Sequence, residues 1–129
     1  MARGVAHIGR DTYQTRIKVG GHALIGDEPE RNGGADTGPA PYDFLLAGLG
    51  ACTAITLRMY ADRKQWPLEA VAVALHLTHG DDNAMLIRRE LQFSGALDAN
   101  QKARMAEIAE KTPVTLTLKA GIRIDTSVA

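Results

Sequence analysis

The chain has 129 residues, enough for one domain with a hydrophobic core, and its 15 basic and 15 acidic residues cancel at pH 7. This balance, with only 5% aromatic residues, argues against a nucleic-acid-binding protein, which typically carries a basic surface and stacking platforms. The single cysteine argues against a secreted domain held by disulfides.

The sequence gives no indication of a membrane or export segment. The first residues, MARGVAHIGRD, lack the apolar stretch of a signal peptide. The longest apolar segment is interrupted by Asp43 and Arg58 and contains two glycines, which argues against a membrane span. We therefore expect a soluble, cytoplasmic protein whose partners include neither a membrane nor nucleic acid.

The N-terminal third predicts a β-hairpin followed by a long loop. Polar and apolar residues alternate over 13–19, Gly20-Gly21 can take positive φ at both positions of a turn, and HALI follows. Residues 26–41 are rich in glycine and proline and show no periodicity. A loop of this length is more often a binding loop or an exposed linker than a plain connection.

The central segment predicts a long helix from Pro41 to Lys64. Pro41 and Asp43 suit the first turn, and Trp66-Pro67 ends the helix. Residues 44–55 are apolar on every side, so we expect this part to be buried on most faces. The polar final turns, RMYADRK, should emerge into solvent.

The remaining residues predict a second hairpin, a second helix and a last strand. Residues 71–79 and 86–93 flank the turn GDDN, and Asp98 with Gln101 forms a capping-box start for a helix ending at Lys111. Ile122 and Ile124 alternate with charged residues, as in a strand. This irregular order indicates a single α+β domain over 1–129. One small sheet can hardly cover the apolar helix, which suggests a homodimer.

Cys52 is the first candidate for chemistry. A lone cysteine inside an apolar helix is often inert packing. However, Gly48 and Gly50 each cost about 1 kcal/mol relative to alanine in a helix, which predicts that another backbone or a ligand approaches this turn. A reactive cysteine must also form its thiolate, and in mid-helix this requires a cation from elsewhere in the fold.

Arg89 is one candidate for that cation. It shares the strand phase of Ile87 and Leu91, so it should point toward the apolar side, where charges are paired or functional. The alternative is a structural ion pair, for instance with Glu28 or Asp43. Arginines 10 and 16 are weaker candidates, and the second of them suits a solvated strand face.

No cofactor or metal site is expected. His76 and His79 lie three apart on a predicted strand and face opposite ways, while the other two histidines lack partners at ligand spacing. The glycine-rich loop has neither a phosphate-binding nor a dinucleotide-binding pattern, and no serine stands in a G-x-S-x-G elbow.

Four stretches together resemble the OsmC/Ohr family, the osmotically inducible and organic-hydroperoxide-resistance proteins. They are DEP (27–29), GGADTGPAPYDFLLAGLGACTAITLRMYADRKQWPLEAV (33–71), IRRELQFSGAL (87–97) and AEKTPV (109–114). The match is closest to the OsmC-like branch and covers nearly the whole chain. It implies an OsmC-like fold, with antiparallel sheets, a long buried central helix, a second helix and an intertwined homodimer.

The resemblance also implies a chemistry. In active members a helix cysteine, matching Cys52, attacks the O–O bond of an organic hydroperoxide and becomes a sulfenic acid. A second cysteine then forms a disulfide with it, which a dithiol reductant reopens. An arginine and a glutamate hold the thiolate and the peroxide.

The sequence departs from this pattern at the second cysteine, whose position is occupied by Thr112. Threonine cannot resolve a sulfenic acid, although it can cap the turn that Pro113 begins.

The family's acid and arginine are also displaced. The glutamate position aligns with Tyr42, which leaves Asp43 and Glu28 as candidates for the orienting acid. The family arginine aligns with Arg10, and Arg89 is the alternative from strand phase.

Two functions follow from these observations. The first is a hydroperoxide reductase that uses Cys52 and depends on an external thiol or dithiol. The second is a non-enzymatic protein of the same fold that binds or senses a small hydrophobic molecule at the dimer interface. A cysteine acyl transferase or hydrolase ranks last, because no histidine partner is evident.

Overall fold

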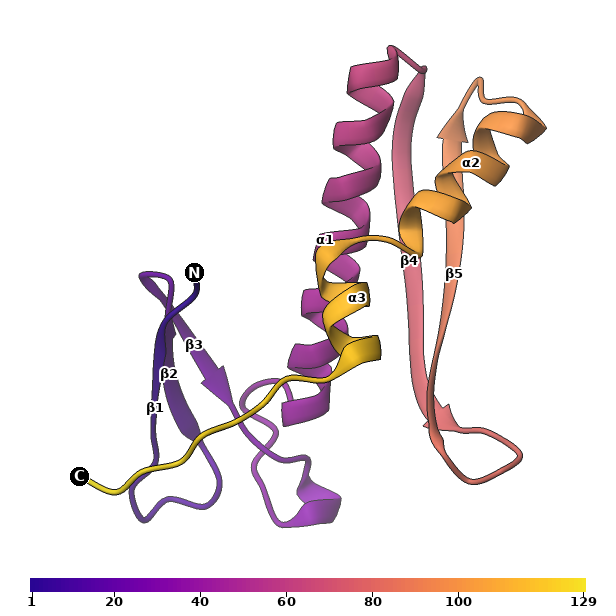
Figure 1. Cartoon of the computed structure of the whole chain (residues 1–129). Helices are drawn as coiled ribbons and strands as arrows, with labels where there is room; N and C mark the ends of the chain where they lie inside the picture. Colours follow the sequence, from indigo (N-terminus) through magenta and orange to yellow (C-terminus); the bar gives the residue numbers. More distant parts are fainter. The chain divides into compact units, whose positions relative to one another are not determined.

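A computed structural model describes all 129 residues. The architecture is α+β, as predicted (Figure 1). The elements in chain order are β1 (Gly4–His7), β2 (Thr15–Val19), β3 (His22–Gly26), the short 3-10 helix η1 (Glu30–Asn32), α1 (Pro41–Lys64), β4 (Leu68–His79), β5 (Met85–Gly95), α2 (Ala99–Ala109) and α3 (Pro113–Ala120).

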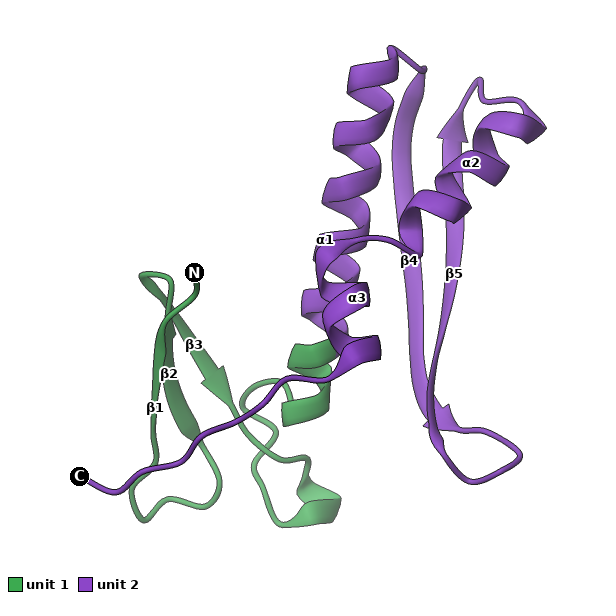
Figure 2. Cartoon of the chain, in the orientation of Figure 1, with its two compact units in different colours: residues 1–45 green, residues 46–129 purple.

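The chain divides into two compact units, residues 1–45 and 46–129, and α1 begins in the first and continues in the second (Figure 2). The first unit holds an antiparallel sheet in the order β1-β2-β3. The predicted hairpin is β2–β3, and both turn glycines have positive φ. Strand β1 was not predicted, because its four residues are too few to show an alternation.

The loop between β3 and α1 is folded closely on itself. A Cβ atom at Gly34 would collide with the carbonyl of Glu28, and one at Gly38 would collide with the carbonyl of Ile25. Only glycine permits such approaches of backbone to backbone. The predicted loop therefore exists, but much of its glycine content serves close packing.

The second unit contains the hydrophobic core. Strands β4 and β5 form the predicted antiparallel hairpin, with an irregularity in register near Leu68. Helix α2 begins at the predicted capping box, in which Asp98 and Gln101 cap each other. The buried core residues come from α1, α2, the start of β4 and the segment after β5: Leu57, Ala61, Leu68, Leu97 and Met105.

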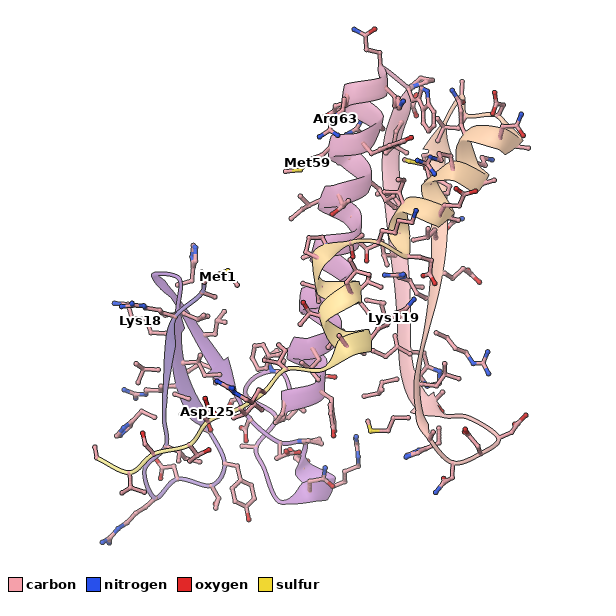
Figure 3. The ribbon with its side chains drawn as sticks, in the orientation of Figure 1. Met1, Lys18, Met59, Arg63, Lys119 and Asp125 are labelled. Carbon is pink, nitrogen blue, oxygen red and sulfur yellow. The ribbon has the colours of Figure 1, made fainter.

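Helix α1 has the predicted bounds, but its burial differs from the prediction. One row along the helix is buried, consisting of Leu49, Thr53, Leu57 and Ala61. The opposite side is open, with Ile55 53% and Met59 62% exposed, and Figure 3 shows Met59 extending away from the helix. The expectation of burial on most faces is thus wrong for the single chain, since a two-stranded sheet covers only one side. The polar final turns emerge into solvent as expected, with Asp62, Arg63 and Lys64 exposed, although Ala61 belongs to the core.

The C-terminal segment also differs from the prediction. Residues 113–120 form helix α3, and no strand follows, since residues 121–129 have no regular secondary structure. The start of α3 carries a side-chain cap at Thr112 and a proline in its first turn, both of which favour a helix. The alternation of Ile122 and Ile124 is strand-like, but no strand of this chain pairs with them.

Candidate functional site

Cys52 is a free, half-buried cysteine in the second unit. It immediately precedes Thr53 of the buried row of α1. The two nearby glycines have different surroundings. A Cβ atom at Gly50 would lie 2.9 Å from Cδ1 of Leu75 on β4, whereas one at Gly48 would meet nothing within 4 Å. The predicted close approach is thus made by the chain's own strand at Gly50, and the helix is open at Gly48.

Arg89 on β5 points inward, with only 11% of its side chain exposed. Its Nη1 donates to the hydroxyls of Thr53, at 3.0 Å, and Thr115, at 2.8 Å. Its Nη2 donates to the carbonyl of Ala109, at 2.9 Å, and the carboxylate of Glu110, at 2.7 Å. Its acidic partner is Glu110, a residue that the sequence did not suggest. Arg89 makes no hydrogen bond to Cys52.

Thr112, at the position of the family's second cysteine, is completely buried. Its hydroxyl oxygen lies 2.7 Å from that of Thr115 and accepts a hydrogen bond from the Thr115 amide, at 3.4 Å, as the N-cap of α3. The capping role suggested by the sequence is confirmed. A continuous polar cluster results, running from Thr112 through Thr115 and Arg89 to Thr53.

The sequence alone did not indicate the three side chains that bind Arg89: Thr53, Thr115 and Glu110. The spacing of two threonines around Pro113 was a usable signal, because an N-cap residue bonds to the third residue beyond it. Glu110 also accepts from Lys119 of α3, at 3.2 Å. Lys119, and secondarily Arg89, hold the pKa of Glu110 below its ordinary value.

The other predicted site residues lie in the first unit. Glu28 accepts a hydrogen bond from the side chain of Asn32, at 3.2 Å. Asp43 accepts from the amide of Ala40, at 2.9 Å, and so caps the start of α1. Arg10 is exposed in the connection between β1 and β2 and forms no ion pair.

The first unit also contains an open cavity of about 1010 Å³. Its walls are formed mainly by residues of the three-stranded sheet, by Phe44 of α1 and by the loop residues Asp27, Glu28 and Asn32. The apolar part of the lining includes Ile17, Val19 and Leu24.

No three histidine, cysteine, aspartate or glutamate side chains gather where they could hold a metal ion. Helix α1 is long and apolar enough to cross a membrane by length and composition alone, a property that core helices of soluble proteins share. Its continuous buried row, which includes Leu57 and Ala61, belongs to a packed core.

These features define an α+β protein with a single half-buried cysteine on its longest helix. The OsmC family model, described as OsmC-like protein, matches residues 33–127, a range that contains Cys52, Arg89 and Thr112. The chain therefore belongs to the OsmC family. No curated protein matches it significantly.

Solved structures of this family share the fold. An OsmC-like protein from Mycoplasma pneumoniae is 16% identical with a TM-score of 0.76, covering 92% of this chain and 87% of that one. An organic hydroperoxide resistance protein OsmC from Legionella pneumophila is 20% identical, TM-score 0.65, with coverage of 92% and 89%. One from Elizabethkingia anophelis is 18% identical, TM-score 0.64, with coverage of 91% and 87%.

Proposed function

We propose that this protein is a cytoplasmic, thiol-dependent organic hydroperoxide reductase in which Cys52 is the peroxidatic cysteine. The observation that carries the proposal is the position of the chain's only thiol. It lies half-buried on α1, inside the segment that matches the OsmC family, and two of the structural relatives are named as organic hydroperoxide resistance proteins.

The first step is a two-electron oxidation of sulfur. The Cys52 thiolate attacks one oxygen of the hydroperoxide, an S–O bond forms and the O–O bond breaks. The other oxygen leaves with a proton as the alcohol, and Cys52 becomes a sulfenic acid. A cation must stabilise the thiolate and a nearby acid must orient the peroxide.

Arg10 is the better candidate for the cation. Arg89 has already committed four of its five N–H donors to Thr53, Thr115, Ala109 and Glu110. Arg10 is exposed and free of ion pairs, and the resemblance noted in the sequence matches it to the family arginine. Glu28 and Asp43 are the candidates for the orienting acid.

The second step requires a thiol from outside the chain. The sulfenic acid condenses with an external thiol, which releases water and leaves a mixed disulfide. A second thiol, or the other arm of a dithiol, then attacks this disulfide and regenerates Cys52. Thr112 cannot take this part, because it has no sulfur and its hydroxyl is held at the start of α3.

The proposed enzyme is a homodimer. The open side of α1 carries the exposed apolar residues Leu45, Ile55 and Met59, and the helix at Gly48 has empty space beside it. An exposed apolar stripe of this length on a soluble protein is typical of an interface. A second copy of the chain would cover it and would enclose the half-buried thiol.

The alternative is a non-enzymatic protein that binds or senses a small hydrophobic molecule. The cavity of about 1010 Å³ in the first unit favours it, because its lining is largely apolar and includes two acids, Asp27 and Glu28. Such a protein would bind an apolar ligand without oxidation of Cys52.

The deciding experiment treats the intact protein with a stoichiometric amount of cumene hydroperoxide in the presence of dimedone. We expect mass spectrometry to find a dimedone adduct on Cys52, absent from Cys52→Ser, and turnover of the hydroperoxide when a dithiol is added. A protein that forms no adduct, and that consumes no hydroperoxide with any monothiol or dithiol, would falsify the proposal.

A further inference from the structure

The proposed reaction leaves one costly feature of the second unit without a role. Arg89 carries a charge into a largely buried position, where an apolar side chain of similar volume is often as stabilising or more so. Its acidic partner, Glu110, is 60% exposed and shared with Lys119, so the ion pair itself contributes little. The guanidinium is instead distinguished by the number and direction of its hydrogen bonds.

One of these bonds reaches the turn of α1 that contains Cys52. The Thr53 hydroxyl accepts from Arg89 at 3.0 Å and donates to the carbonyl of Leu49 at 2.7 Å. Leu49 and Thr53 bracket Cys52 in the helix. A threonine that bonds back to the carbonyl four residues earlier often bends a helix. The polar chain from Arg89 through Thr53 to Leu49 therefore fixes the buried side of the turn.

The remaining bonds anchor the guanidinium at the junction of α2 and α3. Ala109 offers its carbonyl at the C-terminal end of α2, where a cation is favoured by the helix dipole. Thr115 lies in the first turn of α3 and is itself bonded to the N-cap Thr112. Groups from α1, α2 and α3 thus meet at the guanidinium of Arg89 on β5, and each contact constrains the others.

We propose that Arg89 is a positioning residue for Cys52. It sets the orientation of the turn that carries the thiol, through Thr53, and it is not the cation that faces the thiolate. This inference rests on the proposed peroxidatic role of Cys52. Attack on a bound hydroperoxide demands an accurate alignment of sulfur with the O–O bond, whereas alkylation by a small reagent in solution requires only an accessible thiolate.

The test compares these two reactions in matched variants. Arg89→Lys keeps the charge but loses the planar fork of donors. Thr53→Val removes the link at the α1 end, and Thr53→Ser restores its hydroxyl. Arg88→Lys is the control, since Arg88 is the exposed neighbour on the same strand. For each protein we measure the rate of sulfenic acid formation with cumene hydroperoxide and the rate of iodoacetamide alkylation across pH.

We expect Arg89→Lys and Thr53→Val to slow sulfenic acid formation by about tenfold or more while alkylation stays within about twofold, with an unchanged pH profile. Thr53→Ser and Arg88→Lys should match the parent protein. Three results would overturn the inference: parallel changes in both reactions, which indicate a purely structural role; an alkylation profile moved by about one pH unit, which indicates a direct thiolate partner; or no change in either.

The same variants separate failure of this inference from failure of the proposed reaction. If the parent protein forms no sulfenic acid, the proposed peroxidatic role of Cys52 is disproved. Hydrogen exchange then tests whether Arg89 positions the turn that carries Cys52. Amides of residues 49–57 should exchange about tenfold faster in Arg89→Lys and Thr53→Val than in Arg88→Lys, because the turn loses its anchor. Equal exchange in all of these proteins would contradict the inference.

Discussion

The carboxylate of Asp27 is held by Thr37 through two hydrogen bonds, one from the hydroxyl at 2.6 Å and one from the amide at 3.1 Å. Its other oxygen accepts from the amide of Glu28 at 2.7 Å. The Thr37 hydroxyl and then these amides lower the pKa of Asp27 to about 2, against the opposing effect of burial. Asp27 therefore ties the two ends of the loop that precedes α1.

The first prediction concerns acid stability. Because the pKa of Asp27 is lower in the folded protein than in the unfolded chain, about 3.9, its contribution is complete above about pH 4 and is lost as the pH falls through about 2. Urea unfolding should show that Asp27→Asn is less stable than the parent protein at neutral pH. The difference between their free energies of unfolding should narrow as the pH falls from about 4 to about 2. Asp81→Asn, in an exposed turn, is the control and should show no such gap. A pH-independent gap would contradict the assignment.

A second prediction concerns the cap of α3. Thr112→Ala removes the side-chain cap and one hydrogen-bond partner of the Thr115 hydroxyl. It should therefore lower the free energy of unfolding by about 1–2 kcal/mol. Thr112→Ser keeps the hydroxyl and should recover most of this loss. Equal stability of the alanine and serine variants in urea would show that the cap contributes nothing.

A third prediction uses Gly48 to detect a second copy of the chain. Within one chain a methyl group at this position meets nothing, so Gly48→Ala should stabilise an isolated monomer by up to about 1 kcal/mol through helix propensity. If another helix packs there, the same change should weaken association. Analytical ultracentrifugation combined with thermal unfolding distinguishes the two. A variant that is more stable and equally dimeric would exclude Gly48 from the interface.

A fourth prediction tests the open side of α1 more directly. Ile55→Glu places a charge where an apolar partner is proposed, and it should convert a dimer to monomers or aggregates. Met85→Glu is a matched control, because Met85 is equally exposed but lies at the start of β5. Light scattering after size exclusion is the measurement. Identical dimer populations for the two variants would argue against an interface along this side of α1.

A fifth prediction concerns the opposite side of the same helix. Leu57 is completely buried in the core with Ala61 and Met105, so Leu57→Ala should cost roughly 2–5 kcal/mol in the free energy of unfolding. Ile55→Ala should cost less than about 0.5 kcal/mol within one chain, because that side chain is half-exposed. Chemical denaturation at low protein concentration makes this comparison. Similar losses for both would indicate that the two sides of α1 are equally packed.

Local signals in the sequence were sufficient for most elements. The bounds of α1 follow from Pro41 at its start and Trp66-Pro67 beyond its end, and the start of α2 follows from its capping box. These signals act within a few residues, so they can be recognised in the sequence without knowledge of the tertiary structure. Helix α3 was not predicted, although Thr112 caps its start and Pro113 lies in its first turn.

The site was harder to predict, because it depends on contacts between distant segments. Strand phase indicates that Arg89 faces inward, but the sequence alone does not reveal that its partners come from α1, α2 and α3. The burial of α1 was overestimated for a related reason. Apolar composition measures what a helix can bury, whereas actual burial depends on how much of the surrounding protein can cover it.

The tight loop before α1 has a consequence for mutational scans of this protein. A side chain at Gly34 or Gly38 collides with backbone, and Asp27 and Thr37 close the loop between them. Variants at these positions should score as inactive in a survival screen because less folded protein accumulates, even where the chemistry of Cys52 is intact. When activity is normalised to the amount of soluble protein, variants at these four positions should show near-normal specific activity. Variants at Cys52 should remain inactive.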